Sequence, residues 1–134
     1  MTGETDRSKL LTSIQPVLHP GTFVFVTLKP GETCSASVTP IMTFREREGL
    51  TLRAPEGEVH TAGLASAFPS RMITLDVNSS LFAIGFLAEI DARLAKAGIP
   101  VNIVSAYFHD HLFVPPDRAE QAMGILRSGT AEES

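Results

Sequence analysis

The sequence predicts an α+β fold, an antiparallel sheet with helices packed on one of its faces. Residues 71–128 follow the order strand, helix, strand, strand, helix. Residues 22–77 follow the order strand, strand, strand, helix, strand. A final strand shared between the halves would complete a second unit of the βαββαβ type. We therefore expect one unit in residues 1–68, which includes a leading helix, a second unit in residues 69–128, and a disordered tail at residues 129–134.

The first half of the chain carries three stretches with the residue patterns of strands. Thr22–Leu28 is rich in β-branched and aromatic residues, and its continuous apolar character indicates burial on both faces. Ile41–Glu46 alternates apolar and polar residues, and Leu50–Arg53 returns after a glycine turn, which predicts a hairpin. Pro55 suits the start of a helix, so we expect a short helix over residues 55–63.

The second half holds the strongest helical pattern. Apolar residues spaced three and four apart form one stripe along residues 81–97, and Gly98 is the expected C-cap of this helix. Two apolar strands follow, joined by the polar corner His109-Asp110-His111. Asp117 then caps a last helix, in which alanine, methionine and leucine side chains face inward.

Composition and charge narrow the class of protein. The formal net charge of the 134 residues is −4, and no cluster of Lys and Arg offers a phosphate-binding surface, so we expect no nucleic-acid partner. The single cysteine, Cys34, has no partner for an internal disulfide. The start of the chain lacks a signal-type pattern, and no apolar run is long enough to span a bilayer. These features predict a cytoplasmic protein with no membrane partner and no cofactor.

Several stretches resemble a known family. Met72–Gly85, Leu94–Ser105 and Asp110–Val114 are similar to an ACT domain. Phe44–Leu52 and His109–Pro115 resemble hallmark stretches of small bacterial proteins that contain two tandem ACT-like units. The resemblance implies ferredoxin-like units that pair edge to edge in a homodimer and bind a free amino acid at a unit interface. It implies a regulatory module and not an enzyme.

In the ACT interpretation, a ligand cleft lies between the turn before the main helix and the following hairpin. Backbone N–H groups and the positive end of that helix favour an anion such as an amino-acid carboxylate, although the serines of the turn can also act as plain helix caps. The family's Asp-x-x-Gly turn is absent, and the first glycine stands inside the predicted helix, where it indicates close packing or a close ligand. The expected ligand-binding residues are Asn78, Ser79, Ser80, Leu81, Gly85, Asn102, Ile103 and Asp110.

The residues of the hairpin allow more than one role, and the chain as a whole allows more than one function. Asp110 suits a turn, where its carboxylate binds local N–H groups, or it meets the ammonium group of an amino-acid ligand. Asn102 faces either a neighbouring unit or solvent. His109 and His111 point the same way on a regular strand, yet zinc usually takes three or more protein ligands, so a metal-binding protein is the weaker alternative. A structural protein that only dimerises through its open sheet edges is the other alternative.

Overall fold

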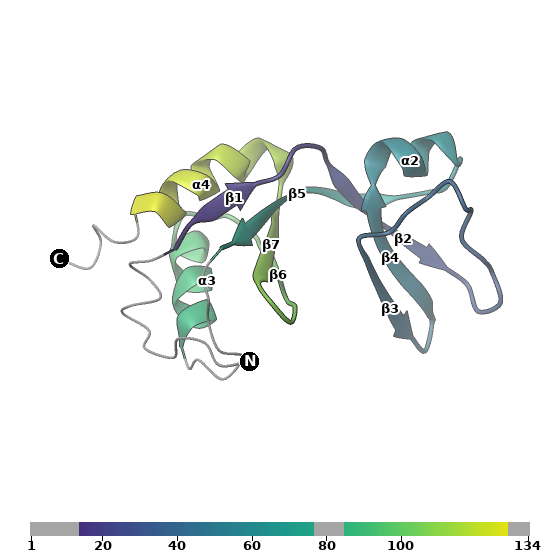
Figure 1. Cartoon of the computed structure of the whole chain (residues 1–134), viewed down its shortest axis with the longest axis horizontal. Coiled ribbons are helices and arrows are strands. Elements are labelled where there is room, and N and C mark those ends of the chain that lie inside the picture. The colour runs from purple at the N-terminus through teal and green to yellow at the C-terminus, as the bar shows by residue number, and fades with distance from the viewer. Residues whose placement is uncertain (1–13, 77–84, 129–134) are drawn as a thin grey trace. The chain divides into compact units, whose positions relative to one another are not determined.

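The computed structural model describes residues 14–76 and 85–128, which form two compact units (Figure 1). The central unit is residues 20–70, and the terminal unit combines the described residues up to His19 with those from Arg71 onward. Strand β5 (Ala67–Leu75) belongs to both, because its first residues pair with β2 and its last residues pair with β7.

The central unit is a sheet of antiparallel neighbours in the order β3-β4-β2-β5. Its elements are β2 (Phe23–Leu28), β3 (Met42–Glu46), β4 (Gly49–Pro55) and the short helix α2 (Glu56–Thr61). Alternate residues of β2 and β4 turn inward and pack against Val59 of α2, which gives this unit its own apolar core. The core residues are Val24, Val26, Leu28, Val38, Leu52, Ala54 and Val59.

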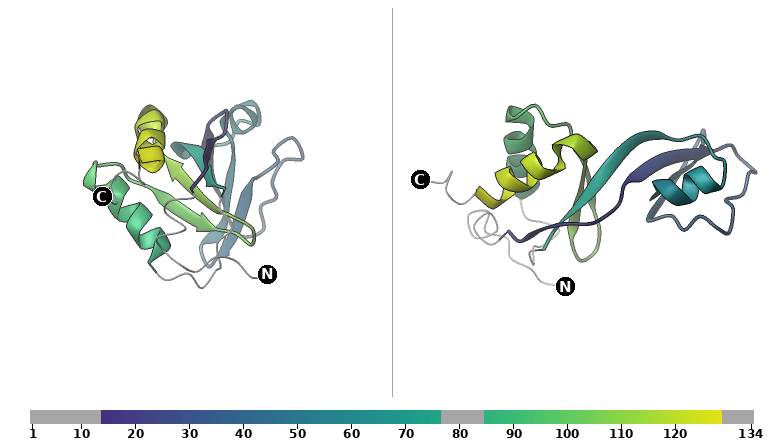
Figure 2. Two further views of the ribbon diagram at one scale, coloured as in Figure 1. Left: turned by 60° about the vertical axis from the view of Figure 1, so that its left-hand side comes forward. Right: turned by 90° about the horizontal axis from the view of Figure 1, so that it is seen from above.

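The terminal unit has the strand order β1-β5-β7-β6, again with antiparallel neighbours. Its strands besides β5 are β1 (Pro16–Leu18), β6 (Asn102–Ser105) and β7 (Asp110–Val114). Helix α3 (Phe86–Lys96) follows β5, and α4 (Ala119–Arg127) follows a single 3₁₀ turn, Pro116–Arg118. The two helices lie side by side over one face of the sheet (Figure 2). This is a ferredoxin-like βαββαβ unit whose last strand comes from the beginning of the chain.

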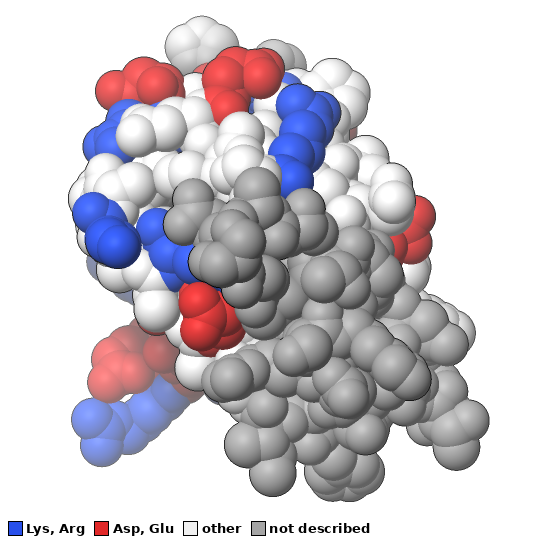
Figure 3. All heavy atoms as spheres, turned by 90° about the vertical axis from the view of Figure 1, so that its left-hand side faces the viewer, with Lys and Arg blue, Asp and Glu red and all other residues white. Residues whose placement is uncertain are grey.

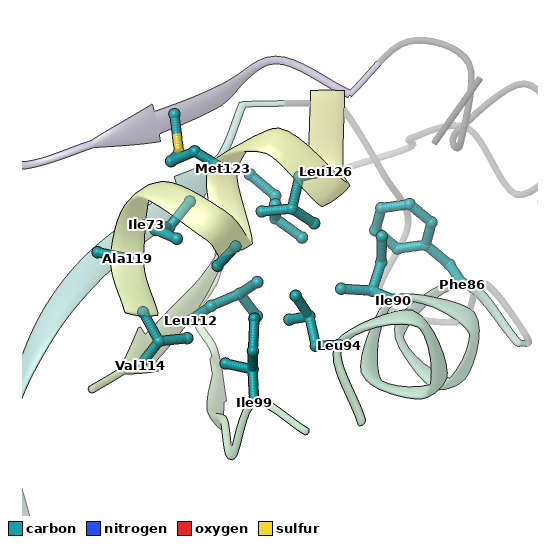
Figure 4. Packing of buried hydrophobic residues seen from close by; sticks show 12 residues of the cluster. Ile73, Phe86, Ile90, Leu94, Ile99, Leu112, Val114, Ala119, Met123 and Leu126 are labelled. Atoms are coloured by element: carbon teal, nitrogen blue, oxygen red, sulfur yellow. The ribbon is translucent and has the colours of Figure 1, made fainter. Parts of the chain in front are cut away.

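One apolar cluster joins the two helices to the sheet in the terminal unit (Figure 4). Leu112 of β7, Leu94 of α3 and Ile99 point toward one another and are at most 2% exposed. Burial of one such side chain stabilises the fold by about 1.5–3 kcal/mol relative to exposure. The cluster therefore fixes how α3 and α4 lie on the sheet.

The predicted α+β class with helices on one sheet face is confirmed, but the start of the main helix is corrected. Gly85 is not inside the helix; it is the N-cap residue of α3 and has φ +84°. That left-handed conformation is incompatible with a helix interior, so α3 begins at Phe86 and not at residue 81.

Two smaller corrections concern helix ends. Ala97 is the C-cap of α3, and Gly98 follows it with φ +75°, the position where a left-handed glycine commonly ends a helix. Asp117 lies within the 3₁₀ turn, and the cap residue of α4 is Arg118, which makes no side-chain cap hydrogen bond. The predicted leading helix falls almost wholly on residues 1–13, outside the described residues.

Strand β1 lies in the terminal unit, whereas the predicted division between residues 68 and 69 places its residues in the first unit. β1 pairs with β5 through Pro16 and Leu75, Val17 and Thr74, and Leu18 and Ile73, all within the terminal unit. The guanidinium of Arg71 also donates to the carbonyl oxygen of His19, with N···O distances of 2.8 and 3.2 Å. A long-range pairing of this kind leaves no local signal in the sequence.

The distribution of charged side chains and the length of the helices relate to the expectations of no nucleic-acid partner and no membrane partner. On the face drawn in Figure 3, the described basic and acidic side chains are intermingled and do not gather by sign. Within residues 14–76 and 85–128, every helix is too short or too polar to cross a bilayer.

Candidate functional site

The start of α3 presents backbone N–H groups at one end of the terminal unit. Gly85 occupies the N-cap position, and it has no side chain that could bond to the first-turn N–H groups. Its carbonyl oxygen accepts the first helical hydrogen bond from the Glu89 N–H at 3.0 Å. The N–H groups before Glu89 have no intrahelical partner, and they lie at the positive end of the helix dipole. This arrangement favours an anion.

Asp110 supplies a buried carboxylate in the same unit. It is 8% exposed and is the first residue of β7, where it pairs with Leu75 on one side and Ser105 on the other. Directly paired residues of antiparallel strands project from the same face of a sheet. Because Leu75 belongs to the cluster beneath the helices, the Asp110 side chain also projects on the helix face. The structure thus places Asp110 in a strand and not in the turn, which is closed by the Ala106 N–H donating to the His109 carbonyl at 3.0 Å.

The topology brings Gly85 and Asp110 to one end of the terminal unit. Helix α3 follows β5 and runs back over the same sheet face, so its first residue lies at the end of the sheet where β5 finishes. Asp110 pairs with Leu75, the last residue of β5, at that same end. Phe86, next to Gly85, shares a buried cluster with Leu75. The other expected residues of this end, Asn78, Ser79, Ser80 and Leu81, lie outside the described residues.

The structure does not bring Asn102 and Ile103 to this end. Asn102 pairs with Phe113, three rungs of the ladder away from Asp110, and it is exposed. Ile103 pairs with Leu112 and packs against the cluster under the helices, so it lies on the opposite face from Asn102. The expected ligand residues therefore divide between two ends of the hairpin.

A hydrogen-bonded histidine cluster, not predicted from the sequence, lies on the sheet face that the helices leave open. The Thr74 hydroxyl bonds to His19 Nε2 at 2.7 Å and to His111 Nδ1 at 2.9 Å. His109 packs edge-on against His111, with ring centroids 6.5 Å apart and planes at 88°. The cluster ties β1, β5 and β7 together. The cluster depends on the strand register that pairs Thr74 with His111, which the sequence does not show.

The electrostatics of this cluster favour an uncharged ring at its centre. Burial lowers the pKa of His111, the nearby His109 and His19 lower it further, and Asp110 opposes them. The Thr74 hydroxyl has a single hydrogen, so at least one of the two rings donates a hydrogen bond to its oxygen. Among residues 14–76 and 85–128, no group of three or more His, Cys, Asp or Glu side chains is arranged to hold a metal ion. The geometry is that of a structural hydrogen-bond chain.

The fold and the sequence together define the family. Residues 2–71 match one family model described as an ACT domain, and residues 67–128 match a second model with the same description. The chain belongs to the ACT domain family and contains two tandem ACT units, as the sequence resemblance predicted. ACT domains are usually regulatory modules that bind amino acids.

Solved structures agree with this assignment. A Vibrio cholerae protein of unknown function, described as a possible transport protein, is 39% identical, with a TM-score of 0.83 over 92% of this chain and 94% of that one. An Agrobacterium tumefaciens protein is 17% identical, with a TM-score of 0.71 over 87% of this chain and 89% of that one, and shares the fold. An aspartate kinase from Clostridium acetobutylicum, an allosteric enzyme, is 10% identical, with a TM-score of 0.63 over 89% of this chain and 34% of the kinase. No curated protein matches the sequence.

Proposed function

We propose that this protein is a non-enzymatic regulatory module that binds a free amino acid. The observation that carries the proposal is the position of Gly85 and Asp110 at one end of the terminal unit. The ligand carboxylate meets the first-turn N–H groups of α3, which Gly85 has no side chain to bond, and the ligand ammonium meets the Asp110 carboxylate. Both ends of a zwitterion then have a complementary group.

Gly85 and Asp110 have different roles in this site. Gly85 at the N-cap has no side chain to bond to the first-turn N–H groups, and an L side chain at its φ of +84° would be strained. Asp110 is buried at the sheet end, so its bond to an ammonium group is shielded from water and is stronger than a surface pair. The site therefore selects molecules that carry both charges.

Binding can act on a partner through the packing of units. We further propose a homodimer in which strand β6, which pairs with β7 on one side within the described residues, adds edge to edge to a second copy. A ligand that binds one arrangement of the dimer more tightly shifts the population toward it. Asn102 lies on this edge strand and would face the second copy in the dimer.

Titration calorimetry of the full chain against the free amino acids tests the proposal. We expect one amino acid, or one class of them, to bind, and Asp110→Asn to weaken binding by about 10- to 100-fold because a hydrogen bond to a charged group contributes about 1.5–3 kcal/mol. Asp91→Asn is the matched control, since Asp91 is an exposed aspartate on α3, and it should bind as the unaltered chain does.

Two results would overturn the proposal. One is that no free amino acid binds at millimolar concentration while the chain is folded. If the chain still dimerises under those conditions, the structural alternative is favoured. The other is that an amino acid binds equally well to the unaltered chain and to the Asp110→Asn variant.

A further inference from the structure

The central unit contains a hollow on the face of its sheet opposite its core. The hollow has a volume of about 480 Å³, within the range of roughly 300–1,000 Å³ that small-molecule sites occupy. Phe25 and Thr27 of β2 and Thr51 of β4 lie on the face of the sheet that borders it. Val26 also lines the hollow, although it belongs to the core on the other face together with Leu52. Residues 65–68 form the remaining wall.

An irregular strand places an aromatic ring at the rim of this hollow. Phe23 pairs with Ser70 and Phe25 pairs with Ala67, so β5 has one residue more than β2 between these pairs and forms a bulge. Within the bulge Phe68 has φ +54°, an unfavourable conformation for a bulky residue. Its side chain is 75% exposed and stands edge-on to the Phe25 ring, with centroids 6.4 Å apart. The strained backbone thus holds an exposed ring in a position with no role in the core.

A buried arginine fixes the other aromatic wall. The guanidinium carbon of Arg53 lies 4.0 Å from the centroid of the Phe25 ring, and Arg53 is 1% exposed. Burial lowers the pKa of its guanidinium to about 10, so it keeps its charge at neutral pH. The cation–π contact orients Phe25 without adding a charge to the lining of the hollow.

The charge of the lining is negative. Among the described residues that line the hollow, Glu46 is the one that carries a formal charge. Its carboxylate accepts a hydrogen bond from the Thr51 hydroxyl at 2.5 Å, which holds it at the rim. The nearby Arg47 is paired with Glu48 at 3.2 Å, and Arg45 alternates to the other face of β3. A cation with an apolar body is the complement of these groups.

We propose that this hollow is a second ligand site, which binds a small amine whose ammonium group pairs with Glu46 and whose apolar body lies against Phe25 and Phe68. The site goes beyond the proposed amino-acid site, because all of its residues belong to the central unit. The exposed Phe68 ring attracts the cation through its face, and both rings cover the apolar body, whereas the Phe25 ring already has the Arg53 guanidinium over it. The carboxylate of an amino acid finds no charged complement among the lining residues, so the free amine is preferred over the zwitterion.

Titration of the full chain with phenethylamine, phenylalanine and hydrocinnamate, followed by NMR, tests this site. These probes share an aromatic body and differ in carrying a positive, a zwitterionic and a negative charge. We expect phenethylamine to bind most tightly, with shifts in the amide signals of Thr27, Thr51 and Ala67. Raised ionic strength should weaken its binding, since Glu46 is exposed and its pairing is screened by salt.

Matched variants separate the parts of the site. Phe68→Ala should weaken phenethylamine binding by about fivefold or more, and Phe68→Leu should do so by less because it keeps apolar bulk. Phe108→Ala is the control, since Phe108 is 65% exposed in the terminal unit. Glu46→Gln should weaken binding by about two- to fivefold and remove its salt dependence, whereas Glu48→Gln, on the same hairpin, should change neither.

The proposal is overturned if phenethylamine does not bind, if hydrocinnamate binds as well as phenethylamine, or if Phe68→Ala binds phenethylamine as the unaltered chain does. It is also overturned if Phe68→Ala changes the oligomeric state in sedimentation, because the hollow is then covered by a second copy. Asp110→Asn should leave phenethylamine binding unchanged. A failure of the amino-acid site is therefore distinguishable from a failure of this one.

Discussion

The hairpin between β3 and β4 allows a sharp test, because one glycine in it has no room for a side chain. Gly49 has φ +153°, and a Cβ added there would overlap the backbone carbonyl oxygen of Leu28 and lie 3.1 Å from its carbonyl carbon. Leu28 is the last residue of β2 and pairs with Leu50. Gly49→Ala therefore forces β2 and β4 apart at the end of their ladder, where Leu28 pairs with Leu50.

The expected cost follows from what must move. A strained backbone conformation costs about 1–3 kcal/mol, and each ladder hydrogen bond lost at the end of β2 adds about 1 kcal/mol. Gly49→Ala should thus lower the free energy of unfolding by on the order of 3–5 kcal/mol. For a chain of this size that corresponds to a fall in Tm of about 10 °C or more.

Thermal and urea unfolding followed by circular dichroism measure this change. Gly57→Ala is the matched control, since Gly57 lies in α2 and an added Cβ there meets nothing within 4 Å. It should raise the free energy of unfolding by about 0.5–1 kcal/mol, because alanine is the better helix former. A Gly49→Ala variant that melts within about 2 °C of the unaltered chain would show that the added Cβ is accommodated without this cost.

Three further predictions concern the terminal unit. Leu112→Ala should lower the free energy of unfolding by about 2–5 kcal/mol in urea, since Leu112 is 0% exposed in the cluster under the helices. Thr74→Val keeps the side-chain shape but removes its bonds to His19 and His111, and should cost about 1–3 kcal/mol in the same assay. Burial, with His109 and His19 beside it and Asp110 opposing, lowers the pKa of His111 in the folded chain, so the unfolded chain binds the proton first as pH falls. Stability should therefore decline as pH drops through the ordinary histidine range, and His111→Gln should flatten this decline in unfolding curves recorded across that range.

The strands were predictable because their patterns are local. Thr22–Leu28 was expected from its β-branched and aromatic residues, and the structure has β2 at Phe23–Leu28. The expected hairpin of Ile41–Glu46 with Leu50–Arg53 corresponds to β3 and β4. Successive residues of these strands sort themselves onto two faces with a period of two, which can be read along a single segment.

The start of α3 was not predictable from the same kind of pattern. Apolar spacing extends back to residue 81, so periodicity alone placed Gly85 inside a helix. The left-handed backbone of Gly85 makes it the N-cap, so α3 begins at the next residue. A backbone conformation of this kind cannot be read from the spacing of apolar residues. The correction matters for the proposed function, because a glycine at the N-cap has no side chain to bond to the N–H groups that the proposed ligand meets.

The remaining features depend on pairings between segments distant in sequence. His19 and His111 meet at Thr74 only because β1 and β7 both flank β5. The hollow of the central unit depends on a bulge that turns Phe68 toward Phe25, and Phe68 alone reads as an ordinary exposed aromatic residue before a proline. Neither the register of β5 nor the φ of Phe68 follows from local propensity.

Backbone NMR of the full chain, titrated with the amino acid that binds in calorimetry, tests the proposed function most directly. We predict that the largest shifts occur at the amides of Gly85, Phe86, Leu87 and Asp110, where the start of α3 meets the end of the sheet. Binding without shifts at these amides would contradict the proposed site. A folded chain whose spectrum is unchanged by every free amino acid at millimolar concentration would contradict the function itself.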